Sequence, residues 1–177
     1  MSSKGKRNFK EFLSYVIVII AAVVIALLFR MYLFEPYIVP TSSMETTLNI
    51  SDRVIVSKLA YNFNDIKRGD LIVYHSPIEP GKDLVKRAIA FEGEELTFNP
   101  DGTLMINGQL LIEDYLPDND YFYESMSVII GENEIFALGD NRNNSYDSRN
   151  FGPISKDLVF GKVVFKYWPV SRISLVR

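Results

Sequence analysis

The sequence contains no cysteine and only one histidine, His75. The absence of cysteine excludes disulfides, thiolate nucleophiles and cysteine-based metal sites. A single histidine cannot form the multi-histidine sites that hold zinc or iron, so neither a metal nor a cofactor is expected. The 177 residues are enough for one globular domain together with a membrane segment.

The N-terminal part consists of a basic segment followed by a long apolar one. Residues 12–29 contain no charged side chain, and a helix of that length covers about 27 Å, close to the hydrocarbon core of a bilayer. Basic residues before an apolar run place the N-terminus in the cytoplasm by the positive-inside rule. We therefore predict a cytoplasmic basic tail over residues 1–11, a transmembrane anchor over residues 12–30 and an extracytoplasmic domain over residues 31–177. The basic residues of the tail are Lys4, Lys6, Arg7 and Lys10.

A cleavable secretory signal is the alternative, because it also begins with basic residues and an apolar run. The run here is longer than the apolar region of such a signal, and residues 27–30 are not a small-residue cleavage site. An uncleaved anchor is therefore favoured. Residues 31–177 carry a net charge of −7, which argues against nucleic acid as a partner because binding it needs a basic face.

The remaining sequence has the pattern of a mostly β domain. Short runs of β-branched residues bounded by turn residues predict strands at residues 53–56, 70–74, 83–91, 134–138 and 158–168. The pairs Asp101-Gly102 and Asn107-Gly108 supply the positive φ angles of tight hairpin turns, so residues 92–135 are expected to form a β-meander appendage. Residues 113–120 are acidic without the regular ligand spacing of a calcium loop, and we interpret them as solvated surface.

Residues 40–48 are the first segment suited to chemistry. Three hydroxyl residues, Thr41, Ser42 and Ser43, follow a rigid proline. A serine nucleophile needs a turn that exposes its hydroxyl and leaves backbone N–H groups free for an oxyanion. The alternative is a helix N-terminus, because Ser42 followed by Glu45 has the capping-box pattern. The two interpretations are compatible, since a helix start also presents unpaired N–H groups.

A serine nucleophile needs a base, and two residues are candidates. His75 ends a strand and precedes a turn, where a single histidine is usually a surface residue. Lys86 lies on the predicted strand 83–91 and, with a period of two, shares its face only with apolar and small residues. Burial there would lower the pKa of the amine from about 10.4 to about 8. The alternative is a lysine whose amine reaches solvent from a strand edge.

Residues 139–153 form a third segment, dense in Asn, Asp, Ser and Arg between two apolar strands. Such a composition is ordinarily a solvated loop. The length of the segment and its closely spaced charges, Asp147 and Arg149, also suit a hydrogen-bonded active-site loop.

Together these segments resemble the type I signal peptidases, membrane-bound serine proteases that remove signal sequences from exported proteins. The family's Ser-Met step after an apolar approach matches Ser43, and its Lys-Arg motif followed by small residues and a Gly matches Lys86 onward. The loop motif Gly-Asp-Asn…Ser-x-Asp-Ser-Arg matches residues 139–149 without a gap. The order and spacing of the motifs and the preceding anchor also agree, and the short single-anchor Gram-positive members are the most similar form.

The resemblance implies a β-domain of twisted antiparallel sheets in which Ser43 attacks the scissile carbonyl and Lys86 accepts its proton. It further implies that Ser145 orients the Lys86 amine, and that the Thr41 hydroxyl joins the Ser43 backbone N–H in the oxyanion hole. The partners implied are the signal peptides of exported preproteins and the lipid bilayer.

The resemblance also implies that Asp147 and Arg149 form a salt bridge that shapes the site. Shallow apolar pockets would accept small side chains such as Ala at the −1 and −3 positions of the cut. The pocket residues implied are Tyr37, Val39, Met44, Leu48 and Val85.

The chain departs from the usual family pattern at four positions, which bear on turn geometry and pocket shape: Ser42, Thr46, Glu92 and Glu94. An alternative from another functional class is a catalytically inactive, membrane-anchored β-domain that scaffolds export machinery. That alternative predicts an ordinary pKa for the Lys86 amine.

Overall fold

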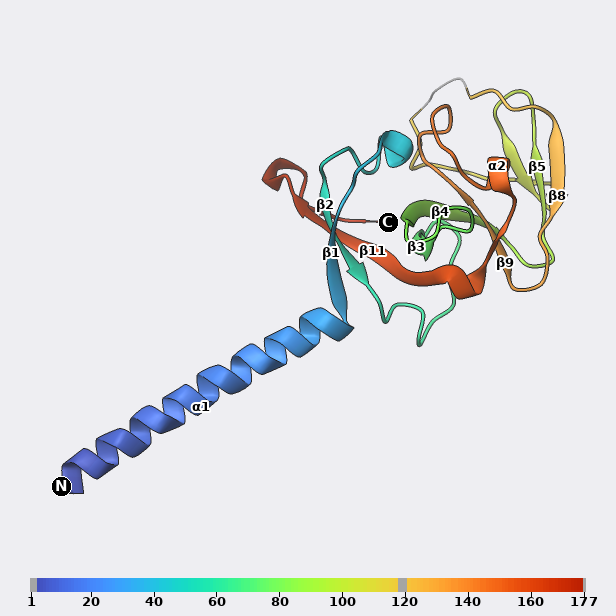
Figure 1. Ribbon diagram of the computed structural model, residues 1–177. Coiled ribbons are helices and arrows are strands. Elements are labelled where there is room, and N and C mark those ends of the chain that lie inside the picture. Colours follow the sequence, from blue (N-terminus) through green and yellow to red (C-terminus); the bar gives the residue numbers. More distant parts are fainter. Residues whose placement is uncertain (1–2, 118–120, 177) are drawn as a thin grey trace.

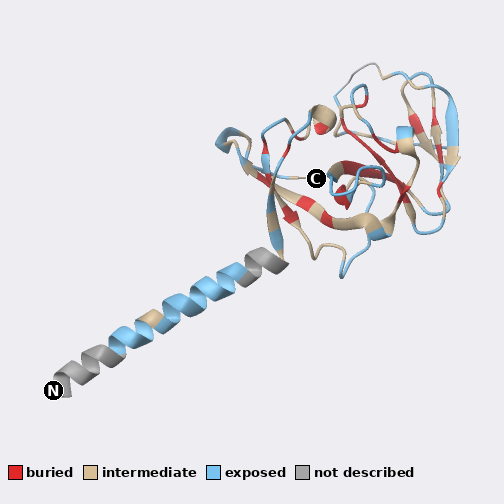
Figure 2. Cartoon of the chain, viewed as in Figure 1, coloured by how far each residue is buried: buried red, intermediate tan, exposed pale blue. Residues whose placement is uncertain are grey.

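The computed structural model describes residues 3–117 and 121–176, except for the side chains of residues 3–10 and 28–32. Helix α1 (Ser3–Tyr32) projects from a rounded β domain (Figure 1). Its apolar side chains between residues 11 and 27 are almost all exposed (Figure 2). Within the described residues, no helix has both the length and the hydropathy required to cross a membrane. The basic side chains of the predicted tail lie outside the described residues.

One antiparallel sheet carries most of the domain, with the strand order β1-β2-β11-β3-β4-β9-β10 and with β12 paired to β11. Register shifts in β11 against both β2 and β3 mark bulges, which bend a strand and curl the sheet. All five strands predicted for this sheet are confirmed, and the bounds of two coincide with the prediction. The strands are β1 (Phe34–Ile38), β2 (Arg53–Ser57), β3 (Leu71–His75), β4 (Asp83–Phe91), β9 (Glu134–Leu138), β10 (Ile154–Ser155), β11 (Val159–Trp168) and β12 (Ser174–Leu175).

A smaller antiparallel sheet has the order β7-β6-β5-β8 and forms the appendage. Gly102 has a φ of 85°, and Asn107 and Gly108 have φ of 50° and 77°, so the predicted tight turns are present. The last strand, β8, was not predicted; it pairs with β5 rather than following β7. The strands are β5 (Glu95–Phe98), β6 (Leu104–Ile106), β7 (Gln109–Leu110) and β8 (Met126–Ile129).

The two sheets share a core. One buried cluster combines Ile89 of β4 and Phe136 of β9 with Leu96 and Phe98 of β5. Burial of this apolar surface holds the appendage against the strand that carries Lys86. Short helical segments complete the domain: η1 (Ser42–Met44), α2 (Ser148–Phe151), η2 (Lys156–Leu158) and η3 (Val170–Arg172).

Candidate active site

The segment after β1 forms a tight turn around Ser43. Thr41 is extended, and residues 42–44 form the single 3-10 turn η1. Met44 is buried beneath the turn, which anchors it to the core. The predicted capping box at Ser42 is wrong, because a single 3-10 turn begins there and no side chain caps its first N–H groups. The Ser42 hydroxyl instead accepts a hydrogen bond from the side-chain amide of Asn144.

Strand β4 places the Lys86 amine against Ser43, the candidate nucleophile. Lys86 Nζ donates a hydrogen bond of 2.7 Å to Ser43 Oγ, and the side chain is only 3% exposed. Burial lowers the pKa of the amine from 10.5 to about 8, although the nearby carboxylates of Asp147 and Asp140 oppose the shift. A large share of the amine is therefore neutral near pH 8, as a general base must be.

Thr41 and Ser145 both lie close to Ser43. Thr41 Oγ1 is 3.4 Å from Ser43 Oγ. A Cβ atom at Gly139 would lie 2.1 Å from Ser145 Oγ and 2.4 Å from the Ser43 carbonyl oxygen, so only glycine permits this approach. Among the described residues Ser145 Oγ has no hydrogen-bond partner, so the hydrogen bond to Lys86 that the resemblance implied is not formed. The Ser145 hydroxyl instead lies near Asp147, where its dipole favours the charged carboxylate.

Residues 139–152, here called the catalytic loop, are held by internal hydrogen bonds, although Asn143, Asn144, Tyr146 and Asn150 are exposed to solvent. Asp147 and Arg149 form the expected salt bridge with two contacts of 2.9 Å, and Asp147 also accepts from the backbone N–H of Gly139. Burial by itself would raise the pKa of Asp147, but Arg149 outweighs it and the pKa is lowered. Asp147 also caps the short helix α2, which the sequence analysis did not predict.

Asn141 connects the catalytic loop to the nucleophile. Its backbone N–H donates to the Ser43 carbonyl over 3.1 Å, and its side-chain amide donates to the Ser42 carbonyl over 3.1 Å. The position of the Ser43 turn therefore depends on the position of this loop.

A second ion pair was missed by the sequence analysis. Arg87 Nε and Nη2 donate to the two carboxylate oxygens of Asp140 over 2.8 and 2.6 Å, and both side chains are almost fully buried. A signal was present in the pattern, because Arg87 lies in the middle of the strand on a face that also carries Val85 and Ile89. A charge on such a face has to be paired.

An apolar cavity of about 210 Å³ opens beside the dyad between β1 and β4. Tyr37, Val39, Met44 and Val85 line it, as the resemblance implied, whereas Leu48 lies in the core beneath it and is fully buried. Further lining residues that were not predicted are Ile38, Val54, Val73, Lys82, Asp83 and Leu84.

Two of the residues that line this cavity, Tyr37 and Asp83, are joined by a polar contact. Tyr37 donates its hydroxyl hydrogen to Asp83 over 3.3 Å. Burial, aided by the carboxylates of Glu35 and Asp83, raises the pKa of Tyr37 to about 12, so the hydroxyl stays protonated near neutral pH.

His75, the alternative base, does not lie at the dyad. Its side chain is 62% exposed and pairs with Asp83 over 2.8 Å, and its ring stacks on Phe160. The expectation of a surface histidine is confirmed. Among the described residues, no group of three His, Asp or Glu side chains could hold a metal ion.

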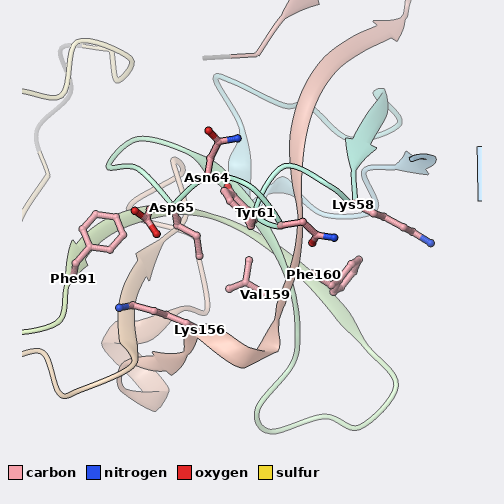
Figure 3. A pocket seen from close by; sticks show the side chains of 10 residues that line it. Lys58, Tyr61, Asn64, Asp65, Phe91, Lys156, Val159 and Phe160 are labelled. Carbon is pink, nitrogen blue, oxygen red and sulfur yellow. The ribbon is translucent and has the colours of Figure 1, made fainter. Parts of the chain in front are cut away.

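A larger hollow of about 350 Å³ lies elsewhere, between residues 58–66 and β11 (Figure 3). Its two lysines are already paired, Lys58 with Glu35 and Lys156 with Glu92. Its lining residues include neither Ser43 nor Lys86. The volume of a cavity therefore does not identify the candidate active site in this protein.

The geometry of the dyad and loop agrees with the comparison to known protein families. The family model described as "Signal peptidase, peptidase S26" matches residues 12–168. The chain belongs to the signal peptidase I family. It is a serine endopeptidase that removes signal peptides from exported proteins.

Relatives cover the chain to different extents. Signal peptidase I of Bacillus licheniformis is 37% identical over 97% of this chain and 95% of its own length. Signal peptidase IB of Staphylococcus aureus is 34% identical over 93% of this chain and 94% of its own length. A probable thylakoidal processing peptidase 2 of Arabidopsis thaliana is 39% identical over 86% of this chain, which spans 43% of that relative.

A solved structure also resembles the domain. The crystal structure of a signal peptidase I from Enterococcus faecalis is 31% identical, with a TM-score of 0.51. The match covers 57% of this chain and 98% of that chain.

Proposed function

We propose that this family member cleaves signal peptides with a dyad of Ser43 and Lys86. The observation that carries the proposal is the 2.7 Å contact between Ser43 Oγ and a buried amine whose pKa is about 8. The neutral amine accepts the proton of Ser43 as Oγ attacks the carbonyl carbon of the residue at −1. The resulting ammonium then donates that proton to the leaving amine, and an acyl-enzyme ester on Ser43 remains.

A second half-reaction frees the enzyme. Neutral Lys86 accepts a proton from a water molecule that attacks the ester, and the proton then returns to Ser43 Oγ. In both halves the oxyanion receives hydrogen bonds from the Ser43 backbone N–H and the Thr41 hydroxyl. The position of Thr41 Oγ1, 3.4 Å from Ser43 Oγ, supports this role. Ser145 is kept as the group that orients the Lys86 amine, through a hydrogen bond that is not formed in this structure.

We further propose that the domain works at a membrane surface. The charge-free run of residues 12–29 behind a basic segment supports an anchor over residues 12–30, a cytoplasmic tail over residues 1–11 and an extracytoplasmic catalytic domain over residues 31–177. Residue 43 follows the run by only 14 residues, which keeps the nucleophile within about 50 Å of the bilayer. A substrate anchored in the same membrane then reaches it at high effective concentration.

The preference for small residues is tested with peptides that differ at one position. The full-length chain in detergent is expected to cut a peptide with Ala at −1 and −3. Phe in place of Ala at −1 should lower kcat/KM by about 10²-fold or more, because the cavity of about 210 Å³ has to take the substrate backbone together with both the −1 and the −3 side chains, and its walls Val39 and Met44 are fixed in the core. Mass spectrometry of the products checks the site of the cut. Equal kcat/KM for the two peptides would contradict the assignment of this cavity.

The pH dependence of cleavage tests the state of Lys86. Because its pKa is about 8, the neutral amine is a minor species at pH 6 and the major species at pH 9. We expect kcat/KM to rise about tenfold per pH unit below pH 7 and to level off above pH 8.5. Initial rates in a series of buffers at constant ionic strength measure the profile. An inflection near 10.5 would show an ordinary lysine and favour the inactive-scaffold alternative.

A further inference from the structure

We propose that Glu113, contributed by the appendage, is a positioning residue for the catalytic loop and acts through the buried guanidinium of Arg142. The inference rests on the proposed Ser43–Lys86 function and adds a requirement to it. The sequence analysis assigned residues 113–120 to solvated surface; that prediction is wrong for Glu113, and Asp120 lies outside the described residues.

Arg142 is held from outside the catalytic loop by Glu113. Its side chain has no exposed surface, and that of Glu113 is 10% exposed. Arg142 Nη1 and Nη2 donate to the two carboxylate oxygens of Glu113 over 2.8 and 2.6 Å. Tyr123, also in the appendage, accepts from Nη1 over 3.2 Å. Two parallel charge-assisted hydrogen bonds fix both the position and the plane of a guanidinium.

Arg142 in turn holds both ends of the catalytic loop. Its Nε donates to the carbonyl of Gly139 at the start of the loop, over 3.0 Å. Its own carbonyl accepts from Arg149 Nη1 near the end, over 2.7 Å. The preceding residue, Asn141, donates to the carbonyl of Ser43. A continuous set of contacts therefore runs from Glu113 in the appendage to the backbone of the nucleophile.

Loss of the Glu113 charge should cost more free energy than loss of a charge from an exposed ion pair, because Arg142 is buried. A buried guanidinium without a carboxylate is costly, and the free energy falls if the side chain moves toward water. Movement of Arg142 would release the Gly139 carbonyl and shift Asn141, and with it the Ser43 turn. Because a displacement of about 1 Å at a reacting atom can lower a rate by about 10²-fold, the expected defect is in the chemical step.

The variant Glu113→Gln tests the inference, because it removes the charge and keeps the size. Asp114→Asn is the matched control: it removes the same charge from the next residue, which is exposed. With the full-length chain in detergent and the Ala-Ala peptide, we expect E113Q to lower kcat by about 10- to 100-fold and to change KM by less than about twofold. D114N should have the same kcat and KM as the parent protein. Amide hydrogen exchange in residues 139–152 should quicken in E113Q and not in D114N.

A merely stabilising role is distinguished by measuring each variant well below its own unfolding temperature. Equal kcat for folded E113Q and D114N would overturn the inference, and so would a defect confined to KM. If E113Q does not fold, the variant Glu113→Asp is used instead, because it keeps the charge but is too short for the bidentate contact with Arg142. A lower kcat of E113D supports the inference, and a kcat equal to that of D114N overturns it.

The variants S43A and K86M are measured in the same assay. Activity of either variant would contradict the proposed Ser43–Lys86 dyad itself. If both are inactive and E113Q keeps the parent kcat, only the proposed role of Glu113 is contradicted.

Discussion

Lys86→Met is expected to lower kcat/KM by about 10⁴-fold or more, because it removes the buried amine that lies 2.7 Å from Ser43 Oγ and takes its proton. Methionine is unbranched and only one atom shorter than lysine, so the cavity walls stay in place. Rates with the Ala-Ala peptide, measured at pH 9 where the parent base is neutral, check the loss. Ser43→Ala is the companion variant and should be equally inactive. Turnover by K86M above about one hundredth of the parent rate would contradict the assignment of the base.

The same substitution should raise stability while it abolishes activity. The pKa of Lys86 is lower in the folded state, about 8, than its ordinary value of 10.5. Folding is therefore penalised below pH 8, where the buried amine is charged, and the penalty disappears as pH rises toward 10.5. We expect K86M to increase the free energy of unfolding by about 2 kcal/mol at pH 7 and by little near pH 10.5.

Denaturant unfolding of K86M and its parent at the two pH values measures this difference. S43A serves as the control, because it keeps the buried amine and should show no comparable gain. Equal stability of K86M and the parent at pH 7 would show that the Lys86 amine is not desolvated in the folded protein.

Asp140→Asn is expected to lower the free energy of unfolding by about 3 to 5 kcal/mol, because it removes the charged carboxylate that accepts two hydrogen bonds from the buried guanidinium of Arg87. Asp140 also accepts from Thr47 over 2.5 Å, so the substitution disturbs a second buried contact. Denaturant unfolding monitored by circular dichroism gives the value.

The matched control for Asp140→Asn is Glu79→Gln. Glu79 pairs with Lys82 over 3.0 Å, but both side chains are about half exposed. Solvent screens such a pair, so its loss should change stability little. Equal destabilisation by D140N and E79Q would show that burial does not decide the strength of these pairs.

Local pattern was enough to predict most of the strands and the chemical candidates. The strand composition of β4 and the turns at Gly102 and Gly108 are properties of neighbouring residues, and both elements were predicted correctly. The loop motif of residues 139–149 likewise placed Asp147 and Arg149 in one segment. Strand β8 was missed because its pairing with β5 depends on a partner about 30 residues away.

What folding alone decided is which distant groups meet and which of them lose water. Ser43 and Lys86 are 43 residues apart in sequence, and Glu113 and Arg142 are 29 apart. Periodicity places a lysine or a glutamate on a face of an element, but desolvation requires a second element to cover that face. The sheet order that lays β4 beside the Ser43 turn lowers the pKa of Lys86, and the appendage that packs on β4 and β9 buries Glu113 in a loop whose composition is that of solvated surface.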